Sequence, residues 1–306
     1  MTGLPAHPDQ QVFHEHRRLL FSVAYRLLGS AADAEDAVQD AWIKWSAADR
    51  SQVADPKAYL TRIVSNLALE RLRSTRHKRE TYVGPWLPEP ILTGGDASEA
   101  VTDAESVSMA MLVVLETLSP LERAVFVLKE VFDFSHAEIA EAVEHSEPAV
   151  RQAAHRAREH VQARRPRFAA DRSRQRRVTE RFFAAATGGD VNALMELLSP
   201  DVTLWTDGGG KVRQALRPVV GAATVANWFA AIGTVTYQGV EPADMKAELV
   251  EINGGPGVVF SGPGRVIATL TFDFDAEGRI TAIHNVANPD KLHAVADGTA
   301  YDIGTG

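Results

Sequence analysis

The first part of the chain has apolar residues at helical spacing. Between Asp33 and Trp45 one face repeats every three or four residues, which is the pattern of an amphipathic helix, and its members are Ala34, Ala37, Val38, Ala41, Trp42 and Trp45. A further helix is predicted from Asp55-Pro56, with the aspartate as cap and proline in the first turn. Residues 8–80 are therefore expected to form an all-α unit.

A second helical block is expected over residues 106–168. Ser119 precedes Pro120 at a helix start, and Ser135 and Glu138 have the spacing of a capping box. A short turn then leads to a helix that begins at Glu147, with a buried stripe of Val150, Ala153, Ala154, Ala157 and Val161. Two helices joined in this way predict a helix-turn-helix.

Residues 81–105 between these blocks have the composition of a linker, with three prolines and the pair Gly94-Gly95. Within it, Trp86 and Leu87 stand beside prolines in the run Trp86-Leu87-Pro88-Glu89-Pro90. A loose tether has no use for a tryptophan, so we expect this run to dock on a protein surface.

The third block, residues 172–292, is predicted to be α+β. Helices are expected over 178–186 and 191–198, and they precede strands over 246–252, 257–260, 265–274 and 279–286. We interpret these strands as a curved antiparallel sheet packed on helices. Residues 293–306 are expected to be a tail, and a cut after Asp297 is expected to change little.

Composition and charge refine this picture. The 306 residues include no cysteine, which excludes disulfides and thiolate metal sites, and the net charge is −8. Two basic runs stand out, 62–79 at +5 and 151–177 at +8, which leaves −21 on the rest. Because phosphate binding depends on the local field, such a chain can still bind DNA. No signal peptide or membrane span is apparent, so we expect a cytoplasmic protein.

The helix after Ser146 carries the side-chain types that read base edges. Arginine pairs with guanine and glutamine with adenine in the major groove, while further arginines suit phosphates. The candidates for DNA binding on this helix are Glu147, Arg151, Gln152, His155, Arg156 and Arg158.

Three runs resemble the extracytoplasmic-function (ECF) sigma factors. The run from Asp33 to Trp42 (DAEDAVQDAW) is similar to their region 2.2, and the run from Pro56 to Arg73 is similar to the regions that melt and read the −10 element. The run from Leu118 to Arg158 is similar to region 4, which reads the −35 element. The resemblance implies core RNA polymerase, through its β′ clamp and β flap, and promoter DNA as partners. It assigns polymerase binding to Glu35, Asp36, Gln39, Asp40 and Trp42. It assigns −10 DNA binding to Lys57, Tyr59, Arg62, Asn66, Arg71 and Arg73.

Three short runs narrow the resemblance to a subgroup with a fused SnoaL-like (NTF2-like) C-terminal domain. They are the proline-rich run at Trp86, Asp207-Gly208-Gly209-Gly210-Lys211-Val212, and Asn288-Pro289-Asp290-Lys291-Leu292. The resemblance implies regulation by the domain itself, without a separate anti-sigma factor. The regulatory contacts expected are Trp86, Leu87, Pro88, Asp207, Lys211, Asn288, Asp290 and Lys291.

Two other classes of function stay open at this point. A one-component regulator would bind an operator and sense a metabolite, but it leaves residues 10–80 without a role. An enzyme would need Asp207, His284 and Trp205 to face a cone-shaped pocket, yet Asp207 opens a glycine-rich turn and His284 fits a strand. We therefore expect no catalytic residue, no metal and no cofactor.

Overall fold

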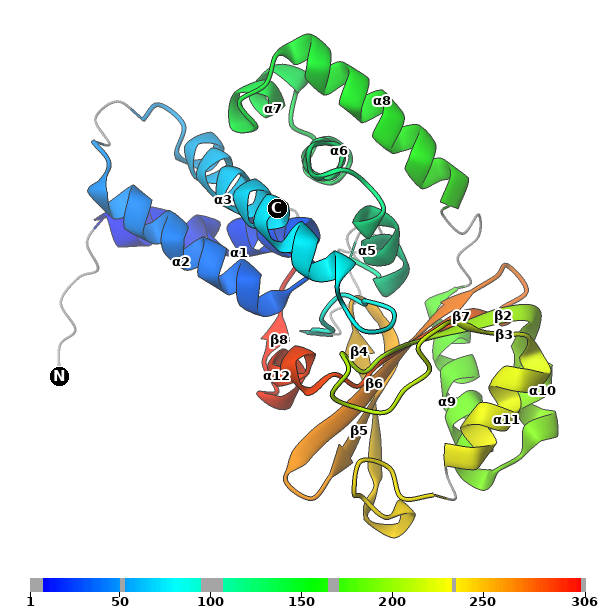
Figure 1. The fold of residues 1–306 in the computed structure, drawn as a ribbon. Coiled ribbons are helices and arrows are strands. Elements are labelled where there is room, and N and C mark those ends of the chain that lie inside the picture. Colours follow the sequence, from blue (N-terminus) through cyan, green and yellow to red (C-terminus); the bar gives the residue numbers. More distant parts are fainter. Residues whose placement is uncertain (1–7, 50–52, 95–106, 165–170, 233–234, 304–306) are drawn as a thin grey trace, which may run out of the picture.

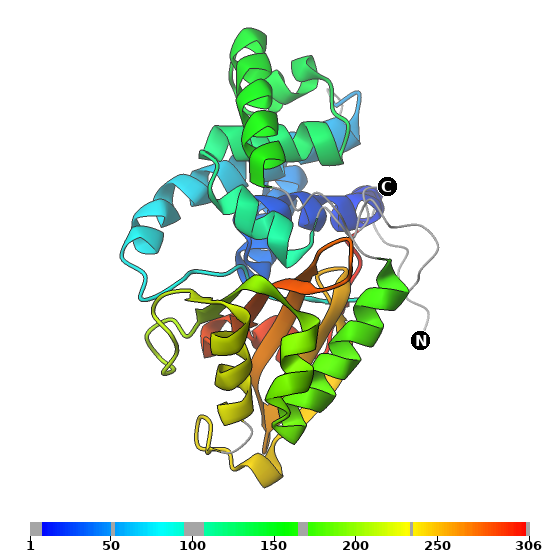
Figure 2. The same ribbon diagram turned by 90° about the vertical axis from the view of Figure 1, so that its right-hand side faces the viewer.

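The computed structural model describes residues 8–49, 53–94, 107–164, 171–232 and 235–303. Figure 1 shows two helical units stacked on a curved sheet, and Figure 2 shows that helices cover the outer face of that sheet. Within these ranges no helix is long and apolar enough to cross a membrane.

The N-terminal helical unit, residues 8–80, consists of α1 (Pro8–Leu28), α2 (Ala31–Ala47) and α3 (Pro56–Glu80). Ser30 caps α2, and its side chain accepts a hydrogen bond from the Asp33 amide at 3.1 Å. The predicted cap of α3 is confirmed, because the Ala58 amide donates to Asp55 Oδ1 at 3.2 Å. Trp45 is buried in the core of this unit, whereas Trp42 is half-buried at its surface.

The helix-turn-helix unit spans residues 107–164. The predicted capping box at Ser135–Glu138 is present, and the predicted cap Ser119 also forms a capping box, with Glu122. Its elements are α5 (Met109–Glu116), α6 (Pro120–Phe126), the π-helix η2 (Val127–Val131), α7 (His136–Ala142) and α8 (Glu147–Arg164). One continuous apolar cluster joins this unit to the N-terminal helical unit, so the two share a core.

The C-terminal domain is a mixed sheet with helices on one face. Its helices are α9 (Arg172–Gly188), α10 (Val191–Leu197) and α11 (Ala222–Ile232), with short 3-10 turns at Pro242–Asp244 and Pro289–Lys291. Its strands are β2 (Leu198–Asp207), β3 (Val219–Val220), β4 (Lys246–Ile252), β5 (Gly255–Gly262), β6 (Arg265–Phe274) and β7 (Ile280–Val286). Together with two outer strands they follow the order β3-β2-β7-β6-β5-β4-β1-β8.

The expectation of an antiparallel sheet is wrong at two places. Strands β2 and β7 pair in parallel, and so do the two short strands β1 (Leu92–Thr93) and β8 (Ala300–Tyr301). No strand was predicted over residues 198–207, so the parallel pairing of β2 with β7 was not expected. A parallel pair requires a long crossover connection, which the chain from β3 to β6 supplies here.

The two faces of the sheet pack against different partners. Leu204, Leu270 and Ile283 face α9, α10 and α11 in one apolar cluster. Val286 faces the other way and packs with Leu87 and Met109. Since neighbouring side chains of a strand point to opposite faces, this second face carries the helical units.

The linker and the end of the chain are both built into the structure. Leu92 pairs with Ile252 of β4 and with Ala300 of β8, so the linker adds a strand to the sheet. Beyond Asp297, Ile303 is buried in the core of the helical units, and Tyr301 stacks on Phe21 with ring centroids 4.6 Å apart. The segment expected to be a tail is therefore part of the fold, and removing residues 298–306 would expose part of that core. We now expect this cut to lower stability, while its small effect on promoter activity stays a prediction. The rest of the predicted linker, from residue 95 on, lies outside the described residues.

Candidate nucleic-acid interface

Helix α8 presents two faces of opposite character. The predicted stripe Val150, Ala153, Ala154, Ala157 and Val161 is buried, as expected from its helical spacing. Arg151, Gln152 and His155 are exposed on the opposite side, in the first half of the helix. Base-reading side chains of a helix-turn-helix come from the N-terminal part of the second helix, which is where these three lie.

Three arginines of α8 have ion-pair partners within the protein. Arg156 Nε lies 2.7 Å from Glu122 Oε1 at the start of α6, and Arg158 Nη2 lies 2.6 Å from Glu130 Oε1 in η2. Arg151 pairs with Glu147 one turn before it. Arg156 and Arg158 thus hold α8 on the rest of the unit, a role that the sequence pattern did not indicate.

Helix α2 exposes part of its acidic face. Asp36 and Gln39 are exposed, while Trp42 packs edge-on against Phe13 at 5.1 Å between ring centroids. A hollow of about 460 Å³ opens beside them, lined by Gln10, Phe13, His14, Arg17, Glu35, Val38, Gln39 and Trp42.

Two residues of the predicted polymerase-binding set have internal partners instead of a free surface. Asp40 Oδ2 lies 2.7 Å from Arg71 Nη2 of α3, and Glu35 Oε2 lies 2.5 Å from Arg17 Nη2 of α1. Arg71 was predicted to bind the −10 element, so this pair joins one residue from each predicted set. Both pairs fasten α2 to its neighbours, which leaves Asp36, Gln39 and Trp42 as the part of the set open to a partner.

Three of the six predicted −10 residues of α3, Tyr59, Arg62 and Asn66, face the helix-turn-helix unit. Arg62 Nη1 lies 3.0 Å from Glu141 Oε1 of α7, and Asn66 Nδ2 lies 3.4 Å from Glu144 Oε1 in the following turn. Tyr59 and Arg62 also line a hollow of about 310 Å³ between α3 and α7. Lys57 and Arg73 are exposed. The acidic side chains of Glu141 and Glu144 thus cover part of the surface of α3 that was predicted to bind the −10 element.

The proline-rich run of the linker docks on the C-terminal domain through a buried ion pair. Lys291 Nζ lies 2.7 Å from Asp207 Oδ2 and donates to the Leu87 carbonyl at 2.6 Å. The Leu87 amide donates to Asp207 Oδ2 at 2.8 Å, and the Trp86 ring lies 4.0 Å from Lys291 Nζ. The predicted docking of Trp86 is confirmed, and a cation over an aromatic ring adds to it.

Tyr82 and Asn288 complete this cluster. Tyr82 Oη donates to Asp207 Oδ1 at 2.6 Å and accepts from Asn288 Nδ2 at 2.8 Å. Burial, and then the bond with Asp207, raise the pKa of Tyr82, so the phenol stays a donor. Lys211 and Asp290, also expected to be regulatory contacts, form an exposed pair at 2.5 Å nearby.

Glu89 and Asn253 join the same linker to the helical units. Glu89 accepts from the Ala31 amide at 2.8 Å and from Ser30 Oγ at 2.8 Å, so it caps the N-terminus of α2. Burial raises the pKa of the Glu89 carboxyl. Asn253 Nδ2 donates at 2.6 Å to Tyr25 Oη, which itself donates at 2.6 Å to the Glu89 carbonyl. No role was predicted for either residue from the sequence. Glu89 belongs to the proline-rich run, whereas no sequence pattern indicates a role for Asn253.

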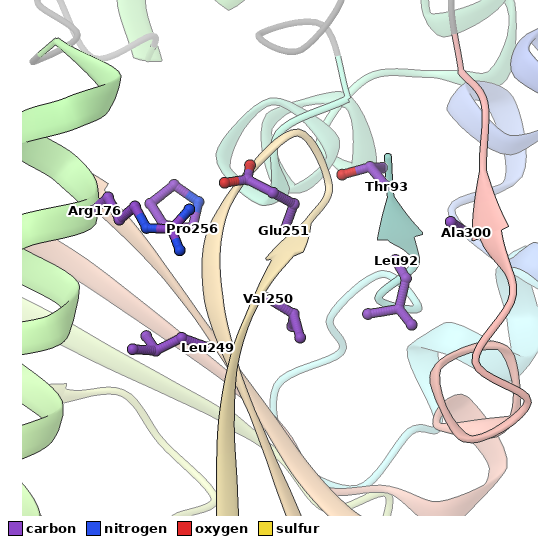
Figure 3. Close-up of a pocket in the computed structure, with 8 residues that line it drawn as sticks. All are labelled: Leu92, Thr93, Arg176, Leu249, Val250, Glu251, Pro256 and Ala300. Atoms are coloured by element: carbon purple, nitrogen blue, oxygen red, sulfur yellow. The ribbon is translucent and has the colours of Figure 1, made fainter. Parts of the chain in front are cut away.

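A third hollow, of about 350 Å³, lies where the linker strand meets the sheet. Figure 3 shows Leu92 and Thr93 of β1 opposite Leu249, Val250 and Glu251 of β4. Only Leu92 of β1 pairs with β4, through Ile252. Beside this hollow the Ile91 carbonyl accepts from the Asn253 amide at 3.0 Å, and Thr93 Oγ1 accepts from the Gly254 amide at 3.0 Å, so the linker is held at this edge too.

Asp207 and His284, which an enzyme would need as an acid–base pair, do not pair with each other. Asp207 is fully buried and paired with Lys291, and His284 Nε2 lies 3.9 Å from Asp273 Oδ2 instead. Trp205 and His284 are neighbours on β2 and β7, on the sheet face turned away from α9. Burial lowers the pKa of His284 and raises that of Asp273, which favours the neutral form of both groups.

Comparisons with known proteins agree with this architecture. The family described as Sigma-70 region 2 matches residues 12–78, and the family Sigma-70, region 4 matches residues 108–161. The ECF RNA polymerase sigma factor SigJ of Mycobacterium tuberculosis is 42% identical over 291 residues, which covers 92% of each chain. Probable ECF RNA polymerase sigma factor SigI of the same species is 29% identical over 93% of this chain and 95% of that one. The crystal structure of SigJ superposes with a TM-score of 0.72 at 37% identity and covers 93% of this chain and 98% of that one.

Proposed function

The chain belongs to the ECF RNA polymerase sigma factors, which are alternative sigma factors of transcription initiation, and from this premise we propose that its own C-terminal domain controls how it selects promoters. The N-terminal helical unit binds core polymerase and the −10 element, and the helix-turn-helix unit reads the −35 element. The cytoplasm, where polymerase and promoter DNA meet, is then its place of action.

The observation that carries this proposal is the exposed first half of α8. Arg151, Gln152 and His155 stand together there, opposite a fully apolar stripe. A helix that packs only by small residues on one side and offers arginine, glutamine and histidine on the other matches the needs of major-groove readout.

Control by the C-terminal domain is supported by the contacts of the linker. Through Asp207 and Lys291 the linker is fixed to the sheet, and through Glu89 the same linker caps α2, the helix proposed to bind polymerase. A change in the C-terminal domain can therefore reach α2 without passing through any other protein. On this proposal no separate anti-sigma factor is required.

Run-off transcription with purified core polymerase on a promoter library tests the function directly. We expect start sites downstream of a shared −35 and −10 pair, and only when the chain is present. Specific DNA binding without any transcript would instead support an operator-binding regulator.

Control by the C-terminal domain is tested with Trp86→Ala. Because the Trp86 ring packs on Lys291, we expect this change to alter promoter activity. Core affinity and thermal stability of the variant are measured as controls.

The role of α2 is tested with one exposed charge. Asp36→Lys should weaken core binding by about tenfold, the equivalent of 1.4 kcal/mol, because it reverses a charge on the proposed interface. Asp40 is less suitable, since it also holds Arg71. Glu196→Lys on α10, which carries an exposed glutamate, is the matched control and should bind core polymerase like the wild type. Unchanged affinity of the Asp36 variant would remove α2 from the interface.

The role of α8 is tested by comparing two arginines. Arg151→Ala should cost roughly 1–3 kcal/mol and relax specificity at one base position of the −35 element. Arg158→Ala should weaken binding on every sequence alike and lower the salt slope by about one. Equal losses for both variants on every sequence would contradict base reading by Arg151.

A further inference from the structure

A loop of the C-terminal domain carries a positive charge that the contacts described so far do not use. Between β2 and β3, residues 208–218 include Lys211, Arg213 and Arg217 and no acidic residue. Lys211 pairs with Asp290, but within the described part of the chain neither Arg213 nor Arg217 has an ion-pair partner. Both arginines are exposed.

This loop is held in one conformation. The Ala215 carbonyl accepts from Thr206 Oγ1 at 2.8 Å, and the side chain of Gln214 donates to Tyr237 Oη. At the other end the amides of Lys211 and Val212 donate to the Gly208 carbonyl at 2.9 and 3.1 Å. A partner that binds the two arginines therefore loses little free energy to ordering of the loop.

The loop lies against the segment that follows α3. A β-carbon placed on Gly210 would come within 3.2 Å of Val83 Cβ, and one on Gly84 within 3.6 Å of Leu216 Cδ2. Figures 1 and 2 both show the loop between β2 and β3 beside the end of α3. Gly84 follows Glu80, the last residue of α3, by four residues, and four residues span at most about 14 Å.

We propose that residues 208–218 form a second phosphate-binding surface, which continues the basic end of α3 and holds the promoter duplex next to the −10 element. The proposal rests on the proposed function, in which α3 meets that element. On one strand of B-DNA a phosphate follows every 3.4 Å of axis, so about 14 Å corresponds to about four base pairs. DNA that passes the end of α3 thus comes within reach of Arg213 and Arg217, which bind its backbone without reading sequence.

The test measures how DNA binding by the complete holoenzyme depends on salt. Fluorescence anisotropy is recorded for full-length chain with core polymerase on two probes, a −35 duplex and a fragment that contains the −10 element with its upstream duplex. The variant is Arg213→Ala with Arg217→Ala. The matched control is Arg176→Ala with Arg181→Ala, two arginines of α9 that are each 63% exposed.

For the loop variant we expect the slope of log K against log salt to fall by about 1–2 on the −10 fragment, because each lost phosphate contact contributes about 0.9. The loss is the same for every −10 sequence and absent on the −35 duplex. Arg213→Lys with Arg217→Lys keeps the slope, and so does the α9 control.

Three results would overturn the proposal. They are a wild-type slope for the loop variant, an equal fall for the α9 control, and a loss of core affinity by the loop variant in the absence of DNA. Failure of the proposed function looks different, because the wild-type holoenzyme would then show no preference for any promoter sequence, whatever the slopes.

Discussion

Two internal seams join the parts of this protein, and they are built in different ways. In the linker seam, which joins the linker to the C-terminal domain, the backbone of Leu87 binds a buried ion pair of that domain. Its members, Lys291 and Asp207, lie 2.7 Å apart, with side chains only 8% and 0% exposed. In the helical seam, between α3 and α7, Arg62 and Glu141 pair at 3.0 Å with side chains 42% and 72% exposed. Apolar contacts accompany both seams, and a hollow lies beside each, of about 310 Å³ at the helical seam and about 350 Å³ where the linker strand meets the sheet.

This difference separates a permanent contact from one that can open. Removing one partner of a buried pair leaves an uncompensated charge, which costs several kcal/mol. An exposed pair contributes about 0–1 kcal/mol and is screened by salt. On the proposal that promoter DNA binds the surface of α3 that α7 covers, the seam that has to open is the one built from exposed pairs.

The largest expected effect comes from breaking the linker seam. Asp207→Ala leaves Lys291 buried without its carboxylate and should lower the free energy of unfolding by about 3–5 kcal/mol. Urea denaturation of the full-length chain measures this. Replacing both partners, with Asp207→Asn and Lys291→Met, should recover part of the loss because no buried charge remains.

A control for this prediction lies a few residues away. Lys211 and Asp290 join the same two segments, but their side chains are 54% and 59% exposed. Lys211→Ala should therefore cost less than about 1 kcal/mol. If Asp207→Ala cost no more than Lys211→Ala, the linker seam would not be the permanent one.

The end of the chain gives the next largest effect. Removing residues 298–306 takes away the buried Ile303, the stacking of Tyr301 on Phe21, and the carbonyl of Ile303 to which Arg26 Nη2 donates at 3.0 Å. Burial of one isoleucine and one aromatic pair together suggests a loss of about 2–4 kcal/mol. Thermal unfolding of the shortened chain measures it, and a melting temperature equal to that of the full chain would contradict this assignment.

The helices were predicted correctly from the sequence because the patterns that indicate them lie within a few residues of each other. The stripe of α8 repeats every three or four residues, and the capping boxes at Ser119 and Ser135 lie within three residues of their glutamates. Two strands, Lys246–Ile252 and Arg265–Phe274, also begin and end where alternation predicted. The docking of Trp86 on a protein surface could also be predicted, since the prolines around it restrict the backbone of the linker.

The features that could not be predicted from the sequence are contacts between residues far apart along the chain. Strand β2 was not found, because its two faces are both largely buried and the alternation is lost. Asp207 reads as the first residue of a turn, and only the fold brings Lys291 to its carboxylate. Ile303, which is buried against α1, and Arg62, which contacts α7, also meet partners far along the chain. Periodicity predicts helices and strands, but it does not indicate which of their surfaces meet.

The smallest expected effect tests the helical seam. Glu141→Gln with Glu144→Gln removes the charges that face Arg62 and Asn66 but keeps the shape of both side chains. We expect the free full-length chain to bind −10 DNA up to about fivefold more tightly, since exposed pairs contribute at most about 1 kcal/mol. Glu196→Gln with Glu277→Gln is the control, because it removes two exposed charges of the C-terminal domain and so corrects for net charge. High salt should abolish the difference between the two variants, because it screens the pairs already in the wild type. An equal gain for both would assign the effect to net charge alone, and no gain for either would mean that apolar packing, not the acidic side chains of the seam, keeps α7 on α3.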